Sequence, residues 1–154
     1  KGSIPVEFRK AIGNRIYGCD DCMAICPWNK FAKPAREASF HAKEELNEPP
    51  LSELLKLQDA EFRALFSKNP VKRIGRDRFT RNVLIAAGNS GDVLLIKDIR
   101  PLLDDPSPLV RAMAVWALGQ LMGKGAFHAL ADANMTREED ESVLREWNYC
   151  LKVA

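Results

Sequence analysis

After residue 50, apolar side chains recur every three or four positions, which is the spacing of amphipathic helices. The pattern predicts helices over 51–57, 60–66, 76–88 and 93–103, the last of them bent at Pro101. The period-two alternation of a half-buried strand is missing after residue 34. The chain is therefore predicted to be mainly α.

Two further helices are predicted from their start signals. Ser107 and Pro108 are a typical cap and first-turn residue, and the apolar run after them predicts a helix that ends near Gly119. Thr136 and Glu139 have the spacing of a capping box, which predicts that the last helix of the chain begins there.

The helical part contains an internal repeat. Residues 85–89 (IAAGN) align with residues 116–120 (WALGQ) at an offset of 31 residues, and the same offset brings Trp147 into register with Trp116. Residues 104–111, followed by an alanine-rich helix, resemble a HEAT repeat, in which stacked helix pairs bury each other's apolar sides. An unrepeated helical bundle is the alternative.

Composition excludes some protein classes. Apolar residues make up 46% of the chain and charged residues 29%, as in globular proteins. No apolar run approaches the roughly 20 residues of a membrane span, and no secretion signal is apparent. We therefore expect a cytoplasmic protein without membrane contact. The chain begins with Lys1 and not with Met, so we expect natural sequence upstream of it.

The net charge is only +2, but positive charge is concentrated between residues 67 and 82, where Asp77 is the one acid. Such a block suggests a surface that contacts an anionic partner. The alternative is a solvated helix face with ordinary ion pairs. The candidate residues for such a contact are Lys68, Lys72, Arg73, Arg76, Arg78 and Arg81.

Three cysteines lie within eight residues, at Cys19, Cys22 and Cys26, and Pro27 follows directly. The run is a shortened version of the ferredoxin pattern C-x2-C-x2-C-x3-C-P, whose last cysteine binds the other cluster in two-cluster proteins. It predicts iron–sulfur ligation, with Cys19 and Cys22 on one cluster and Cys26 on its neighbour.

A structural zinc site is the alternative, with His41 as the fourth ligand beside the three cysteines. The remaining cysteine, Cys150, lies on a predicted helix and is interpreted as a small buried hydrophobe. Three thiolates do not complete a [4Fe–4S] cluster, so further ligands are expected elsewhere. We divide the chain into an iron–sulfur segment (1–34), a connecting segment (35–50) and a HEAT-like helical domain (51–154).

The residues around the cysteines resemble a known enzyme family. The stretches 1–5 (KGSIP), 12–22 (IGNRIYGCDDC) and 25–31 (ICPWNKF) closely resemble the C-terminal half of epoxyqueuosine reductases, and 81–89 (RNVLIAAGN) is similar as well. The resemblance covers essentially the whole chain. Its cysteine core is far more specific than an isolated C-x2-C.

The resemblance implies a function for the full-length protein. The family reduces the epoxide of epoxyqueuosine in tRNA to queuosine, using cobalamin and two [4Fe–4S] clusters. It implies that Cys19, Cys22 and Cys26 are cluster ligands. The implied partners are an external electron donor and a tRNA anticodon stem-loop, which the six candidate residues of the basic block would contact. A monomer is expected. The first cysteine motif, most of the cobalamin site and the catalytic acid belong upstream, so we expect this fragment alone to be inactive.

Two other functions are compatible with the same residues. A protein similar to reductive dehalogenases would also combine cobalamin with two clusters, but it needs neither a HEAT-like tail nor a basic RNA surface. A non-catalytic HEAT-like adaptor would use the cysteines for a structural zinc ion.

Overall fold

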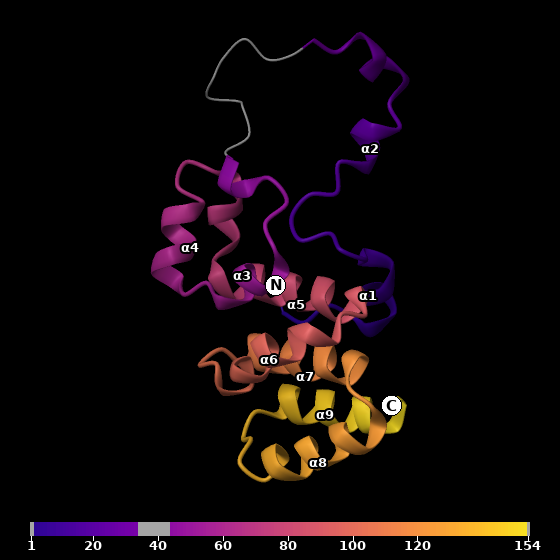
Figure 1. The fold of residues 1–154 in the computed structure, drawn as a ribbon, viewed down its shortest axis with the longest axis vertical. Helices are drawn as coiled ribbons and strands as arrows, with labels where there is room; N and C mark the ends of the chain where they lie inside the picture. The colour runs from indigo at the N-terminus through magenta and orange to yellow at the C-terminus, as the bar shows by residue number, and fades with distance from the viewer. Residues whose placement is uncertain (1, 34–43, 154) are drawn as a thin grey trace.

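The computed structural model describes residues 2–33 and 44–153, and this part of the chain is built from helices joined by short turns, without a β-strand (Figure 1). The expectation of a mainly α fold is confirmed. With η denoting a 3-10 helix, the elements in chain order are α1 (Val6–Ile12), α2 (Asp21–Ala24), η1 (Pro27–Phe31), η3 (Glu44–Leu46), α3 (Leu51–Lys56), α4 (Asp59–Leu65), η4 (Pro70–Ile74), α5 (Arg76–Ser90), η5 (Val93–Leu95), α6 (Ile96–Ile99), η6 (Arg100–Asp104), α7 (Pro108–Leu121), α8 (Lys124–Met135) and α9 (Glu141–Val153).

The long helices α5, α7 and α9 are stacked in chain order, with α7 in the middle and packed against both neighbours (Figure 1). Every residue of α7 from Ala112 to Leu118 is buried. A helix that is apolar on all sides needs partners on all sides. The helices α5 and α9 cover two of these sides, and η6, α6 and α8 contact α7 as well.

The repeat found in the sequence corresponds to successive helices of this stack. Residues 85–89 lie in α5 and residues 116–120 in α7. Gly88 lies directly against the ring of Trp116, so the small residue of one copy accepts the large residue of the next. Trp147, one offset further, is buried in α9 with its ring centre 5.4 Å from that of Phe127 in α8.

The C-terminal end differs from the sequence prediction. Helix α8 was not predicted, and Thr136, expected to cap the last helix, instead follows the end of α8. The last helix begins at Glu141. Its first turn is capped by Asp140, whose carboxylate accepts hydrogen bonds from the backbone N–H of Ser142 at 2.8 Å and of Val143 at 3.4 Å. An aspartate nearer the helix thus replaces the predicted capping box.

Two other predictions need adjustment. Ser107 holds the cap position of α7 but makes no side-chain capping bond. Its own N–H donates to Asp105 at 2.9 Å, and Pro108 begins the helix as predicted. The helix expected over 93–103 is split into η5, α6 and η6, and α6 ends shortly before Pro101, which lacks the N–H that a continuous helix needs.

The predicted domain boundaries stay predictions. Most of the expected connecting segment lies outside the described residues, which resume at residue 44. Among the described helices, none has both the length and the apolar character required to span a membrane.

Candidate functional site

The cysteine loop, residues 18–27, lies apart from the helical body, at the top of Figure 1. Gly18 and Asp20 both have left-handed backbone, with φ of 65° and 50°, and turn the chain ahead of α2. Glycine adopts this conformation without strain, and aspartate tolerates it better than most residues. The cysteines follow in order along this turn: Cys19 before α2, Cys22 inside α2 and Cys26 directly before η1.

The three motif cysteines are free thiols; Cys19 and Cys22 are exposed and Cys26 is half-buried. Among the residues that the structure describes, no three Cys, His, Asp or Glu side chains are close enough to hold one metal ion. Ligands divided between two clusters do not need to converge on one point. The donor set therefore fits part of a two-cluster site. The zinc alternative depends on His41, which lies outside the described residues.

Cys150 is not a candidate for the missing ligand. It is buried in α9 beside Gly119, at the opposite end of the molecule from α2 (Figure 1). Burial, with a smaller contribution from the negative charge of Glu146, raises the pKa of this thiol to about 12. The prediction that Cys150 is a buried small side chain is confirmed.

Apolar side chains surround the cysteine loop and are largely exposed: Met23, Ile25, Trp28 and Phe31. Trp28 is 75% exposed and its ring centre lies 5.9 Å from that of Phe31. Apolar surroundings limit the access of water to a cluster and so influence its reduction potential.

Two asparagines of α5 donate hydrogen bonds to backbone carbonyls in residues 9–17, the stretch that leads into the cysteine loop and is called its stem below. The Nδ2 group of Asn89 donates to the carbonyls of Arg9 and Gly13 at 2.8 and 2.9 Å. The Nδ2 group of Asn82 donates to the carbonyl of Ile16 at 2.7 Å. The helical body thereby fixes the stretch of chain that leads into the loop.

Arg9 is the buried anchor of α1, with 2% of its surface exposed. Its two terminal nitrogens donate to the two carboxylate oxygens of Glu146 in α9, at 2.6 and 3.0 Å. Its Nε donates to the carbonyl of Ile4 at 2.9 Å, and its guanidinium lies 5.4 Å from the ring centre of Trp116. Such two-point ion pairs fix geometry as well as distance, so α1 has a defined position against α7 and α9.

Part of the basic block is freely exposed. Lys68, Lys72 and Arg73 line a cavity of about 370 Å³ together with Asn69 and Pro70, around η4. These side chains are in a position to contact an anionic partner.

Arg76, unlike its neighbours in the basic block, is buried, so the prediction that it contacts RNA is wrong. It was expected among the RNA-contacting residues, but only 6% of its surface is exposed. Its Nη1 donates to Asp105 at 2.5 Å and its Nε to the carbonyl of Leu57 at 3.2 Å. Removing one partner from a buried pair is strongly destabilising, so Arg76 has a structural role. The sequence does not show this, because Asp105 lies 29 residues away.

Arg78 and Arg81 lie together on a second cavity. Among the described residues, neither forms an ion pair with a carboxylate. Burial and then the positive charge of Arg78 lower the pKa of Arg81. Two uncompensated cations side by side favour an anion between them. The cavity measures about 410 Å³ and is lined by Ile16, Tyr17, Gly18, Ile74, Arg78, Arg81 and Asn82.

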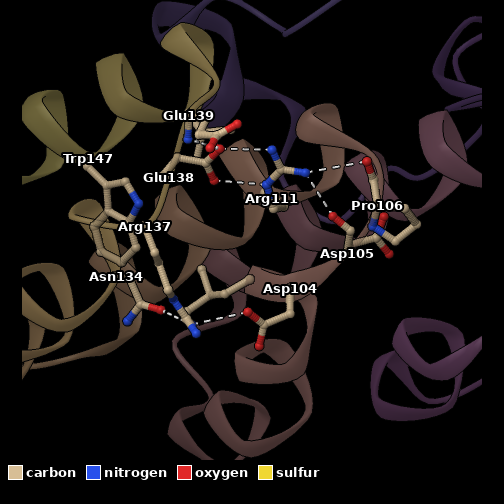
Figure 2. A pocket seen from close by; sticks show the side chains of 11 residues that line it. Asp104, Asp105, Pro106, Arg111, Asn134, Arg137, Glu138, Glu139 and Trp147 are labelled. Carbon is tan, nitrogen blue, oxygen red and sulfur yellow. Dashed lines mark hydrogen bonds and ion pairs between the residues drawn. The ribbon is translucent and has the colours of Figure 1, made fainter.

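In a third cavity, of about 350 Å³, the arginines are paired with carboxylates (Figure 2). Arg111 donates to both oxygens of Glu138, each at 2.8 Å. Arg137 forms an ion pair with Asp104 at 3.1 Å. Because its arginines are already paired with carboxylates, this cavity offers no free positive charge to an anion.

Sequence reasoning missed several of these residues. Nothing in the sequence links Arg9 to Glu146, which are 137 positions apart. Asn82 and Asn89 did carry a signal, since two polar residues seven positions apart share one face of an otherwise buried helix. Tyr17 entered the sequence analysis only as one residue of the stretch 12–22 that carries the family resemblance.

Residues 76–152, half of the chain, match the HEAT-repeat family. The chain belongs to this family. The stack of α5, α7 and α9, with α6 and α8 between them in the chain, is the region that matches. The HEAT-like interpretation of the repeat is therefore confirmed, and the unrepeated bundle is excluded.

The chain that carries these HEAT repeats is also similar to curated epoxyqueuosine reductases. It is 44% identical to the Xanthomonas campestris pv. campestris protein over 122 residues, which are 77% of this chain and 34% of that protein. It is 36% identical to the Bacillus cereus protein over 154 residues, covering 99% of this chain and 40% of that protein. The resemblance inferred from the cysteine core is confirmed. The chain spans about a third to two fifths of the length of these relatives.

Solved structures of epoxyqueuosine reductases are also similar to this chain, and the similarity is not limited to the HEAT repeats. A crystal structure of epoxyqueuosine reductase with a tRNA-Tyr epoxyqueuosine-modified tRNA stem loop matches 99% of this chain and 41% of that chain, with a TM-score of 0.92 and 30% identity. The Streptococcus thermophilus epoxyqueuosine reductase matches 99% of this chain and 40% of that chain, with a TM-score of 0.81 and 29% identity. The similarity therefore extends over the cysteine loop as well.

Proposed function

We propose that this chain is the cluster-binding and RNA-binding part of an epoxyqueuosine reductase, which converts epoxyqueuosine in tRNA to queuosine. The observation that carries the proposal is the similarity, over 99% of the chain, to a reductase solved with an epoxyqueuosine-modified tRNA stem loop. The cysteine loop and the exposed arginines and lysines are the features of this chain that such a role would use.

Removing an epoxide oxygen as water consumes two electrons and two protons. Cobalamin and two [4Fe–4S] clusters would supply the low-valent cobalt and the electrons for this step. The role of this chain is to hold clusters through the thiolates of Cys19, Cys22 and Cys26. The exposed apolar residues beside them, Trp28 among these, would exclude water from the same surface.

The second role is to hold the tRNA. The candidate contacts are Lys68, Lys72, Arg73, Arg78 and Arg81, with Arg76 removed because it is buried. Phosphate contacts supply much of the affinity for RNA, and base chemistry in an enclosed site requires the base to leave its stack. An external electron donor and a monomeric state stay predictions.

The cluster role is tested in the full-length reductase that contains this chain. We expect Cys22→Ala to abolish loss of the epoxide from modified tRNA under anaerobic reduction and to lower the iron bound per protein. Cys150→Ala is the matched control, since Cys150 is buried far from the loop, and it should retain both activity and iron. The tRNA product is measured by mass spectrometry of its nucleosides.

Wild-type iron content and activity in Cys22→Ala would reject the assigned role. Metal analysis of anaerobically purified protein also separates the proposal from the zinc-binding adaptor. Iron with acid-labile sulfide supports the reductase, whereas one zinc per chain without iron supports the adaptor.

A further inference from the structure

We propose that the cavity between the cysteine-loop stem and α5 is a binding site for one phosphodiester group of the RNA backbone, held by Arg78 and Arg81, with Tyr17 against the adjoining nucleotide. The proposal rests on the RNA-binding function proposed above and assigns it a specific pocket. The cavity walls come from residues 16–18 on one side and from Ile74 and α5 on the other.

The charge of the cavity selects an anion. Neither arginine has a carboxylate partner among the described residues, in contrast to Arg111 and Arg137 in the cavity of Figure 2. Within the part of the chain that the structure describes, the Arg78 side chain makes no hydrogen bond that a ligand would have to break, so its guanidinium is available. A planar guanidinium fork matches the oxygens of a phosphate better than an ammonium does.

The wall opposite α5 suits a nucleotide. Tyr17 is 46% exposed at the cavity, and aromatic rings stack on bases and riboses. Gly18 follows with φ of 65° and leaves open space where a side chain would begin. The volume of about 410 Å³ lies in the lower part of the range of small-ligand pockets, about 300–1,000 Å³. The cavity therefore has room for one nucleotide unit.

Hydrogen bonds across the cavity couple it to the cysteine loop. Arg81 donates to the carbonyl of Gly2 at 2.7 Å and to Asn82 at 2.9 and 3.0 Å, and Asn82 donates to Ile16 at 2.7 Å. A phosphate held here lies next to the chain that begins the cysteine loop. The site thereby sets the position of the RNA backbone relative to the cluster ligands.

The test measures RNA affinity against salt concentration, using a tRNA anticodon stem-loop as the probe. Each phosphate contact contributes roughly 0.7 to 0.9 to the slope of log affinity against log salt. We expect Arg78→Gln to reduce that slope by about one contact, roughly 0.7 to 0.9. Arg78→Lys keeps the charge and should keep the slope. Arg145→Gln, an exposed arginine of α9 with only a loose partner in Glu141, is the control and should change nothing.

Tyr17 provides a second, independent readout. Loss of one stacked base weakens binding by about fivefold to a hundredfold without changing the number of phosphate contacts. We therefore expect Tyr17→Ala to lower affinity at every salt concentration while the slope stays that of the wild type. Hydrogen exchange of residues 16–18 should slow when the stem-loop binds, and this protection should be lost in Arg78→Gln.

The outcomes separate the pocket from the general function. If the wild-type chain binds the stem-loop and Arg78→Gln has the wild-type slope, the pocket is rejected and the proposed function stands. If the wild-type chain does not bind the stem-loop, both are rejected. Inorganic phosphate serves as the competitor: a response of the Arg78 side-chain NMR signal to phosphate but not to the stem-loop would also reject the RNA assignment.

Discussion

At position 88 the chain has room for a hydrogen atom and nothing larger. A Cβ placed on Gly88 would lie 2.6 Å from Cζ3 of Trp116 and 3.1 Å from Cα of Ala117. The contact includes backbone of α7, which cannot rotate away as a side chain does. Gly88 thus determines how closely α5 and α7 approach, and it does so in the middle of the buried core.

We expect Gly88→Ala to lower the free energy of unfolding by about 1–3 kcal/mol, because added volume strains a close-packed core. Gly125→Ala is the control, since Gly125 lies in α8 with open space around its Cα. There the substitution should raise the free energy of unfolding, by up to about 1 kcal/mol, since alanine favours a helix over glycine. Urea denaturation measures both, and equal effects in the two variants would contradict the packing argument.

At the scale of elements, the side chain of Glu138 links the turn before α9 to α7. Glu138 accepts two hydrogen bonds from Arg111 of α7 and others from the backbone N–H groups of Glu139 and Asp140. The hydrogen bond with Arg111 is the largest cause that lowers the pKa of Glu138 below its ordinary value of 4.5. This carboxylate therefore ties the turn to the centre of the stack.

The lowered pKa predicts how acid affects stability. Between the ordinary and the lowered pKa, the unfolded chain binds a proton at Glu138 and the folded chain does not, so acid favours unfolding. The contribution of Glu138 is present above about pH 4.5 and is lost as the pH falls through the folded value. We expect the Glu138→Gln variant to lose less stability than the wild type between neutral pH and this acid range, as measured by thermal unfolding. A parallel pH dependence in both would contradict the assignment.

For the molecule as a whole, the ion pair of Arg9 and Glu146 joins the two ends of the described chain. The two residues are 137 positions apart, and both are almost completely buried. Repeat proteins are held together mainly by contacts between neighbouring repeats. Here α1, which precedes the repeats, contacts both α5 and α9 and spans the stack.

We expect Glu146→Ala to cost about 3–5 kcal/mol of stability, because it leaves the buried charge of Arg9 without a partner. Hydrogen exchange in α1 should accelerate more than in α5. Glu141→Ala is the matched control: its pair with Arg145 is exposed, and the change should stay within about 0.5 kcal/mol. Equal loss of stability in the two variants would show that α1 is not held by this pair.

The sequence allowed prediction of those helices whose apolar spacing is strong, such as α5 and α7. It did not reveal α8, because Gly123 and Gly125 at its start are typical of a chain break and only one large side chain, Phe127, is fully buried along it. The packing of α8 against α7 and α9 outweighs this weak local signal.

The candidate site was predictable to the extent that it is local in sequence. The spacing of Cys19, Cys22 and Cys26 identified the candidate cluster ligands, and charge density identified the basic block. Which arginine of that block is buried depends on a partner far along the chain, as with Arg76 and Asp105. The arrangement of charges in space is a property of the fold and is not contained in any short segment.

The hydrogen bonds of Asn82 and Asn89 to the stem of the cysteine loop have a consequence for how this protein can evolve. A peptide carbonyl is the same in every residue type, so the two asparagines recognise the path of the chain at Arg9, Gly13 and Ile16 and not their side chains. Stem residues whose side chains make no other required contact can therefore be substituted in evolution, as long as the backbone keeps its path. Selection on this junction should fall on positions 82 and 89 instead.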